Sequence, residues 1–206
     1  MTEAKERVLA AALRLFAKNG YAATSTSDIA RELGVTKGAL YKHFASKRDI
    51  FESVLARMEE RDAEKAREND LPEGALSEME SAYRAVSIDD IVEFAREMFR
   101  YWTGDEFASA FRKMLTIEQF RDPELGALYQ QYLGAGPLGY TADLLASLGL
   151  SRPKERAVAF YAPMFLLFAI WDSGARAEAT SALDAHLEEA REALKKDLSK
   201  RARNRR

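Results

Sequence analysis

Apolar residues recur at helical spacing along almost the whole chain, and this periodicity limits the possible folds more than any other feature. Near the N-terminus the pattern runs through Val8, Leu9, Ala12, Leu13 and Phe16. Residues three and four positions apart lie on one face of an α-helix, so each such segment can bury one stripe in a core. No segment shows the alternation of apolar and polar residues that is typical of a half-buried strand. The chain is therefore predicted to be all-α, with 206 residues to divide between a small and a larger helical domain.

The first two predicted helices have clear local signals at their ends. Asn19-Gly20 stops the first helix, because glycine readily ends a helix. The second helix begins in the cluster Ser25-Thr26-Ser27, where any of the three hydroxyl groups can act as the N-cap, and it ends at Gly34.

Two further helices follow closely. Thr36 is expected to cap a third short helix, from Lys37 to about His43. Ser46 is expected to cap a fourth, with Asp49 three residues later as the partner in a capping box. This fourth helix, over about residues 47–68, has a charged extension and is predicted to connect two domains.

The second part of the chain is predicted to be another helical array. The clearest break is the segment 69–74, so a small domain of residues 1–50 and a larger domain of residues 70–206 are expected. Pro153 is expected to start the most apolar helix. The helical segments of the larger domain are 88–102, 107–120, 124–148 with a kink or loop at 134–137, a helix around 160–171, and 183–198.

Composition excludes several classes of protein. The chain has no cysteine, which rules out disulfides and thiolate metal sites, and only two histidines, His43 and His186. Its longest nearly apolar run, Val158–Trp171, is shorter than the ~20 residues that a membrane span needs and contains Pro163. The acidic N-terminus does not match a secretory signal, so a cytoplasmic location is expected. Because cysteine is absent and histidine is rare, no metal or cofactor is expected.

The net charge of −2 argues against a nucleic-acid-binding protein, but the charges are unevenly distributed. Residues 1–50 contain nine Lys or Arg and five Asp or Glu, a net charge of +4, whereas residues 51–190 carry −12. Residues 191–206 carry +6 and are interpreted as a solvated basic terminus. A basic head on an acidic body is expected when the head alone contacts a polyanion.

The second and third predicted helices, joined at Gly34, match a helix-turn-helix, in which the second helix enters the major groove of DNA. Ile29, Ala30, Val35 and Leu40 are apolar where the helices must pack. Lys and Tyr side chains can reach phosphates or guanine edges, although Tyr and His at the end of such a helix can also serve packing. The groove-facing side would present Lys37, Gly38, Ala39, Tyr41, Lys42 and His43.

Residues 5–55 resemble the N-terminal domain of TetR-type transcriptional regulators, with matching residues at fixed spacing and no insertion. The residues that carry the resemblance are Phe16, Gly20, Thr26, Ile29, Ala30, Gly34, Val35, Gly38, Leu40, Tyr41, Phe44, Lys47 and Ile50. The resemblance implies that phosphates are contacted by Thr26, Tyr41, His43 and Lys47. It implies that bases are contacted by Ser27, Lys37, Gly38, Ala39 and Lys42.

The resemblance also implies a helical C-terminal domain that encloses a pocket for a small apolar or amphipathic ligand, whose binding releases the DNA operator. Such a pocket is apolar with a few converging polar groups. The candidate lining residues are Trp102, Phe111, Met114, Gln119, Phe165, Phe168 and Asp172, although aromatic residues at helical spacing also make ordinary core.

The last two helices are predicted to form a homodimer. The segment Phe160–Trp171 is apolar nearly all round, more than the core of one monomer requires, and the stripe Leu183–Leu198 lies beside it. Two copies related by a twofold axis would read a palindromic operator in double-stranded DNA.

Two other classes of protein were weighed against the regulator. The chain has no nucleophile elbow, phosphate-binding loop, dinucleotide fingerprint or metal-spaced His/Cys set, so it is not expected to be an enzyme. A helical adaptor that uses the head to bind protein stays open as the alternative. The resemblance favours a repressor, but the ligand, the operator and the distinction between repressor and activator are not determined.

Overall fold

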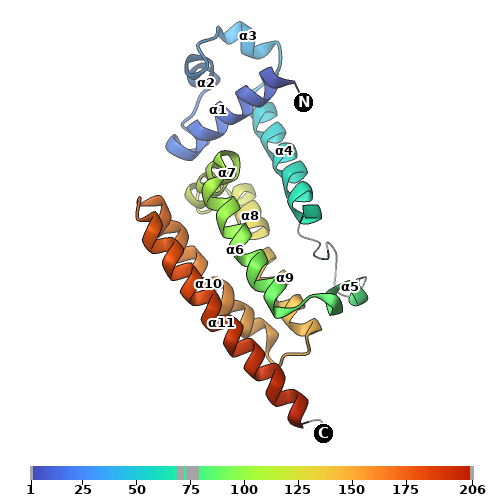
Figure 1. Cartoon of the computed structure of the whole chain (residues 1–206). Helices are drawn as coiled ribbons and strands as arrows, with labels where there is room; N and C mark the ends of the chain where they lie inside the picture. The colour runs from blue at the N-terminus through green and yellow to red at the C-terminus, as the bar shows by residue number, and fades with distance from the viewer. Residues whose placement is uncertain (1, 69–71, 73–78, 205–206) are drawn as a thin grey trace. The chain divides into compact units, whose positions relative to one another are not determined.

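The computed structural model describes residues 2–68, 72 and 79–204, which form α-helices and no strand (Figure 1). The prediction of an all-α chain is confirmed. The helices are α1 (Glu3–Asn19), α2 (Thr26–Glu32), α3 (Lys37–Tyr41), α4 (Lys47–Glu68), α5 (Glu80–Ala85), α6 (Ile88–Gly104), α7 (Glu106–Glu118), α8 (Pro123–Tyr132), α9 (Ala135–Ser147), α10 (Pro153–Asp172) and α11 (Arg176–Asn204).

The chain folds into two compact units, and neither is a single continuous segment. The first unit contains Met1–Lys65 and Asp105–Gln130, and the second contains Ala66–Gly104 and Gln131–Arg206. Residues 1–50 therefore share their unit with α7 and most of α8. The break predicted at 69–74 lies outside the described residues, except for Pro72.

Local hydrogen bonds at the helix ends explain where α2 and α3 begin. The Ser25 hydroxyl accepts from the N–H of Asp28 and the Asp28 carboxylate accepts from the N–H of Ser25, a complete capping box. Thr36 caps α3 by accepting from the N–H of Ala39, as predicted. α3 is one short helix that ends at Tyr41 rather than near His43.

The start of α4 differs from the prediction in one detail. The Ser46 hydroxyl accepts from the N–H of Asp49, as expected of a cap. The Asp49 carboxylate, however, accepts from the N–H of Ala45 and not from that of Ser46. The side chain therefore stabilises the residue before the cap, and the predicted reciprocal box is not formed.

In the first unit, α1 packs against α7 and α2, and its Leu9, Leu13 and Phe16 are completely buried. An ion pair joins α4 to α1, with Arg57 Nε 3.0 Å from Glu6 Oε1. Arg48 of α4 donates two hydrogen bonds to Glu124 of α8.

In the second unit, α10 packs against α6, α9 and α11, and α5 contacts α9. α5 had no counterpart among the predicted helices, and the predicted segment 124–148 is two helices, α8 and α9. α10 continues through Pro163. The stripe of α11 at Leu183, Leu187 and Leu194 is buried within this unit.

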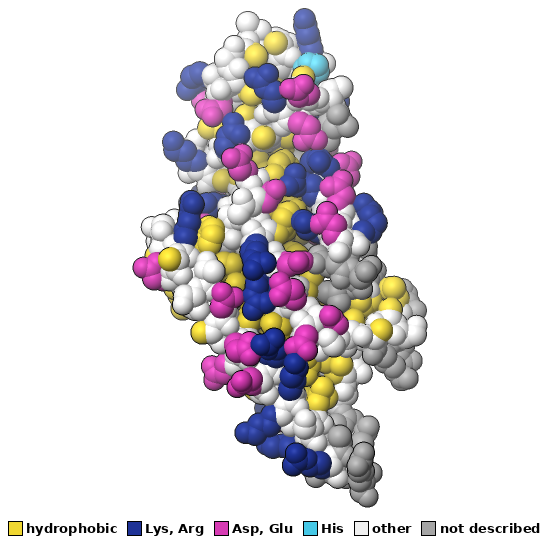
Figure 2. Space-filling view, viewed as in Figure 1, with side chains coloured by type: hydrophobic (Ala, Val, Ile, Leu, Met, Phe, Trp, Pro, Cys, Tyr) yellow, Lys and Arg dark blue, Asp and Glu magenta, His cyan; other side chains and the backbone are white. Residues whose placement is uncertain are grey.

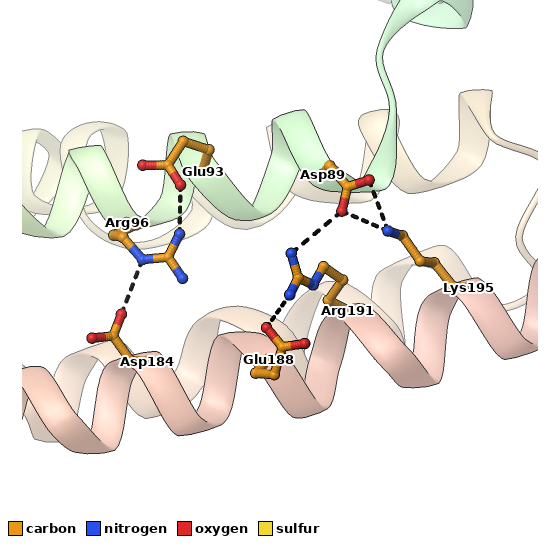
Figure 3. Close-up of polar contacts among 7 residues, drawn as sticks. All are labelled: Asp89, Glu93, Arg96, Asp184, Glu188, Arg191 and Lys195. Atoms are coloured by element: carbon orange, nitrogen blue, oxygen red, sulfur yellow. Dashed lines mark hydrogen bonds and ion pairs between the residues drawn. The ribbon is translucent and has the colours of Figure 1, made fainter.

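Exposed ion pairs follow the contact between α6 and α11 (Figure 3). Asp89 accepts two hydrogen bonds of 2.7 Å from Lys195 and lies 3.7 Å from Arg191. About two turns further along α6, Arg96 donates to Asp184 at 2.9 Å. Such solvent-exposed pairs contribute about 0–1 kcal/mol each, so they define the register of the two helices more than they stabilise them.

Across residues 2–68, 72 and 79–204, none of the helices combines the length and apolar character needed to cross a membrane.

Candidate nucleic-acid interface

The helix-turn-helix is formed by α2, a turn through Gly34, and α3. Gly34 has a φ of +67°, a backbone conformation that side chains with a Cβ adopt only with strain. Ile29, Ala30 and Leu40 are buried between the helices, as predicted. The prediction for Val35 is wrong, because its side chain is 44% exposed. The turn points Val35 outward, and three buried apolar residues are enough to hold the short helices together.

The residues predicted to contact DNA lie on or next to the exposed side of this motif. Ser27, Lys37, Gly38, Tyr41, Lys42 and His43 are exposed, while Thr26, Ala39 and Lys47 are half-buried. A Cβ on Gly38 would meet no heavy atom closer than 3.9 Å. The glycine therefore leaves the backbone of α3 accessible to a large ligand such as a duplex.

Three of the predicted residues form one cluster across α2 and α3. The hydroxyl oxygens of Thr26 and Tyr41 are 3.2 Å apart, within hydrogen-bond distance. The Lys37 ammonium lies 5.8 Å from the centre of the Tyr41 ring. Two hydroxyl groups and an ammonium group at one exposed place are donors suited to phosphate oxygens.

Lys47 makes contacts that its sequence position did not reveal. Its ammonium group donates to the carbonyl oxygens of Tyr21 at 2.9 Å and Ala22 at 3.3 Å. It also lies 4.5 Å from the centre of the Tyr21 ring. Two of its three N–H donors thus bind the turn after α1, which leaves one donor for a phosphate.

Tyr21 and Glu118, which were not among the predicted site residues, form a hydrogen bond beside Lys47. The Tyr21 N–H donates to the carboxylate of Glu118 in α7 at 3.0 Å. Glu118 is almost fully buried. Nothing local marks either residue, because they lie 97 positions apart and meet only in the folded chain.

Charge on the helix-turn-helix is partly neutralised by local pairs. Arg31 binds Asp28 at 2.7 Å, and the hydrogen bonds from Ser25 hold the pKa of Asp28 below its usual value. Lys37 begins α3 and Lys42 directly follows its last residue; both are exposed, and α3 contains no carboxylate. Figure 2 shows Lys and Arg side chains on this part of the surface, and an alternation of basic and acidic side chains over α11.

The seven residues predicted to line a ligand pocket are divided between the two units. Phe111 and Met114 are completely buried in α7 of the first unit, and Gln119 ends that helix. In the second unit, Phe168 stacks on Phe99 at 5.1 Å.

The other three candidates lie in the second unit as well. The Trp102 and Tyr132 rings meet edge to face at 6.4 Å. Phe165 packs edge-on against Tyr161 at 5.4 Å, and Asp172 is exposed at the end of α10. A separate open depression lies at the start of α11 and is lined by Trp171, Arg176, Ala177, Thr180, Ser181 and Asp184. None of the seven candidates lines it.

Residues 8–54 match the family model described as "Bacterial regulatory proteins, tetR family". The match covers α2, the turn and α3 completely, together with most of α1 and the first two turns of α4.

Curated relatives and a solved structure extend the comparison. The uncharacterised HTH-type transcriptional regulator YerO of Bacillus subtilis is 51% identical over 54 residues, which are 26% of this chain and 19% of the relative. The HTH-type transcriptional regulator AcrR of Shigella flexneri is 33% identical over 113 residues, 55% of this chain and 46% of AcrR. The matched segment thus spans about a fifth of the length of YerO and about half of the length of AcrR. The structure of a SmeT–triclosan complex has the same fold, with a TM-score of 0.57 and 20% identity over 91% of each chain.

Proposed function

Because the chain belongs to the TetR family of bacterial regulatory proteins, we propose that it is a sequence-specific DNA-binding transcriptional regulator. The observation that carries this proposal is the exposed cluster of Thr26, Lys37 and Tyr41 on the helix-turn-helix. α3 would enter the major groove, with Lys37, Gly38, Ala39 and Lys42 toward base edges. Thr26, Tyr41, His43 and Lys47 would hold the flanking phosphates.

The regulator would act as a homodimer on a palindromic operator. One face of α10 supports this, because Val158, Ala162, Leu166 and Ala169 recur at helical spacing and are all exposed. The leucine stripe of α11 is used within the chain, so the face of α11 left for a second copy holds small residues such as Ala182 and Ala185. An apolar helix face beside a face of small residues permits close helix packing across a twofold axis.

We further propose that a small apolar or amphipathic ligand releases a repressor from its operator. The aromatic residues of the second unit, including Trp102, Phe165 and Phe168, would bind it, and SmeT is a structural neighbour that binds triclosan. A ligand acts on DNA binding only through its different affinities for the two states of the dimer. Asp172 of the same unit stays a candidate ligand contact, whereas the candidates Phe111, Met114 and Gln119 belong to the first unit and are not assigned to this site.

The test is selection of bound duplexes from a random double-stranded DNA pool by the purified chain. Recovery of a palindromic motif supports the regulator. Its affinity for that motif should fall by about three to five orders of magnitude between low and moderate salt if ~6–10 phosphates are contacted. A chain that retains no duplex at low salt would instead favour the helical adaptor, which binds protein through the head and shows no such salt dependence.

A further inference from the structure

The backbone of Tyr21 is held on its two sides by side chains of opposite charge. Its N–H donates to Glu118 Oε1 at 3.0 Å, and its carbonyl oxygen accepts from Lys47 Nζ at 2.9 Å. Glu118 belongs to α7 and Lys47 to the first turn of α4. The turn that follows α1 is thus fastened to two other helices of the same unit.

The Glu118 carboxylate has two partners, the N–H of Tyr21 and the guanidinium of the exposed Arg121, whose Nη1 lies 3.7 Å from Glu118 Oε1. The side chain is 3% exposed, and a buried carboxylate is costly unless it accepts hydrogen bonds. Gly20 has a φ of +88°, and a Cβ at this position would lie 2.5 Å from Glu118 Oε1. Only glycine therefore allows the carboxylate to reach the N–H of Tyr21.

The Tyr21 ring is fixed as firmly as its backbone. It packs against Phe16 at 5.1 Å and Phe51 at 5.0 Å between ring centres, and Lys47 lies over it at 4.5 Å. Burial raises the pKa of the Tyr21 hydroxyl above its usual value. These three ring contacts add to the backbone hydrogen bonds that hold the turn.

The same turn leads directly into the proposed DNA-binding surface. The Thr24 hydroxyl donates to the carbonyl oxygen of Gly20 at 2.9 Å, and the next residue, Ser25, caps α2. Thr26, the first residue of α2, contacts the hydroxyl of Tyr41 on α3. A shift of the turn would therefore move both the start of α2 and the ammonium group of Lys47.

From these contacts we infer that Glu118 is a positioning residue for DNA binding. Its carboxylate fixes the Gly20–Ala22 segment, and this segment fixes the start of α2 and the direction of Lys47. Because Glu118 is almost fully buried, this role acts through the turn and not through a contact with DNA. The inference rests on the proposed function, because it concerns the affinity of the same helix-turn-helix for DNA.

The test compares Glu118→Ala, Glu118→Asp and Glu118→Gln with the parent chain. Two quantities are measured at a temperature at which each chain is folded: the exchange rate of the Tyr21 amide proton and the Kd for the selected duplex. Glu118→Ala removes the acceptor and Glu118→Asp withdraws it by one methylene. Both are expected to speed Tyr21 exchange and to raise the Kd about tenfold, the order expected for one lost charge-assisted hydrogen bond. Glu118→Gln keeps an acceptor oxygen and should stay within about twofold of the parent.

The matched control is Glu106→Ala, which removes an exposed carboxylate from the same helix and should leave both quantities unchanged. If Tyr21 exchange accelerates in Glu118→Ala and Glu118→Asp while the Kd stays within about twofold, Glu118 only stabilises the fold and the inference is overturned. Unchanged exchange overturns it as well. If the parent retains no duplex at all, the proposed function has failed, and the positioning role fails with it.

Discussion

The hydroxyl groups of Thr26 and Tyr41 lie 3.2 Å apart and join the first residue of α2 to the last residue of α3. The Tyr41 side chain is nevertheless 45% exposed. This exposure leaves the phenol hydroxyl accessible to a ligand. The contact holds the phenol where both of its polar neighbours, Thr26 and Lys37, can face the same phosphate.

Tyr41→Phe tests that arrangement. We expect the Kd for the selected duplex to rise about five- to tenfold, because one hydrogen bond to a charged group is lost. The unfolding free energy should change by less than about 0.5 kcal/mol, since the group is exposed. Fluorescence anisotropy and urea unfolding give the two values. Tyr140→Phe, in the second unit, should change neither the affinity nor its salt dependence.

Lys42→Ala is expected to lower the affinity by an amount that depends on the sequence of the duplex, because Lys42 is proposed to lie toward base edges. If Lys42 contacts a phosphate instead, the loss will be the same for all sequences, and the slope of log affinity against log salt will fall by about 0.9. Titrations at several salt concentrations distinguish these outcomes. Lys196→Ala removes an exposed lysine from α11 as the control. Equal slopes for Lys42→Ala and the parent, with equal affinities, contradict both roles.

Ser25→Ala removes the N-cap of α2 and should lower the unfolding free energy by about 1 kcal/mol. The variant also loses the hydroxyl hydrogen bond that is the main cause of the lowered pKa of Asp28, while the backbone N–H of residue 25 can still donate to that carboxylate. Thermal or urea unfolding measures the effect. Ser27→Ala, an exposed serine two positions later, should leave stability nearly unchanged. A comparable loss in both variants would show that the cap is not the source.

Asp62 of α4 provides a pH-dependent prediction. Burial raises the pKa of its carboxyl from 3.8 to about 6 in the folded chain. The folded state therefore binds the proton more tightly than the unfolded state, so this group lowers stability as pH rises from about 4 to 6. Asp62→Asn should raise the unfolding free energy by about 1–3 kcal/mol at pH 7.5, and the gain should vanish near pH 4.

Urea unfolding between pH 4 and pH 8 measures this difference. Glu59→Gln, an exposed carboxylate on the same helix, is the control and should show no such dependence. A gain in Asp62→Asn that is constant across this range would mean that the charge of Asp62 is not the cause.

Leu166→Glu tests the proposed dimer. Leu166 is 65% exposed on the outer face of α10, so the substitution should leave the fold intact. In a dimer it would bury a carboxylate in an apolar interface, which is costly without a partner. Light scattering at micromolar concentration should give the mass of a dimer for the parent and of a monomer for the variant. Ile117→Glu, at an exposed position of α7, should remain dimeric.

Much of the helix-turn-helix could be predicted because its signals are local. The caps at Ser25 and Thr36, the turn at Gly34 and the buried Ile29 and Leu40 follow from residues within a few positions of each other. Backbone hydrogen bonds at helix ends and the strain of a positive φ act over the same short range. The exposed face of α3 follows from the same periodicity.

Predictions were less successful where several partners compete. Val35 was expected in the core but is exposed, and Asp49 binds Ala45 rather than Ser46. The ammonium of Lys47 binds two carbonyl oxygens of the chain as well as facing solvent. Local sequence identifies a donor or an apolar group, but it does not identify which of several nearby partners the group will choose.

Local sequence was enough to predict the helical class, the cap at which α3 begins and the side of α3 that faces outward. The packing of distant helices places α7 in one unit with α1 and brings Glu118 to Tyr21. The same packing buries Leu183 and Leu187 of α11, whereas Leu166 of α10 stays exposed. The physical reason is that helix propensity and capping depend on neighbours in sequence. The burial of a carboxylate or a leucine stripe depends instead on which distant helix covers it.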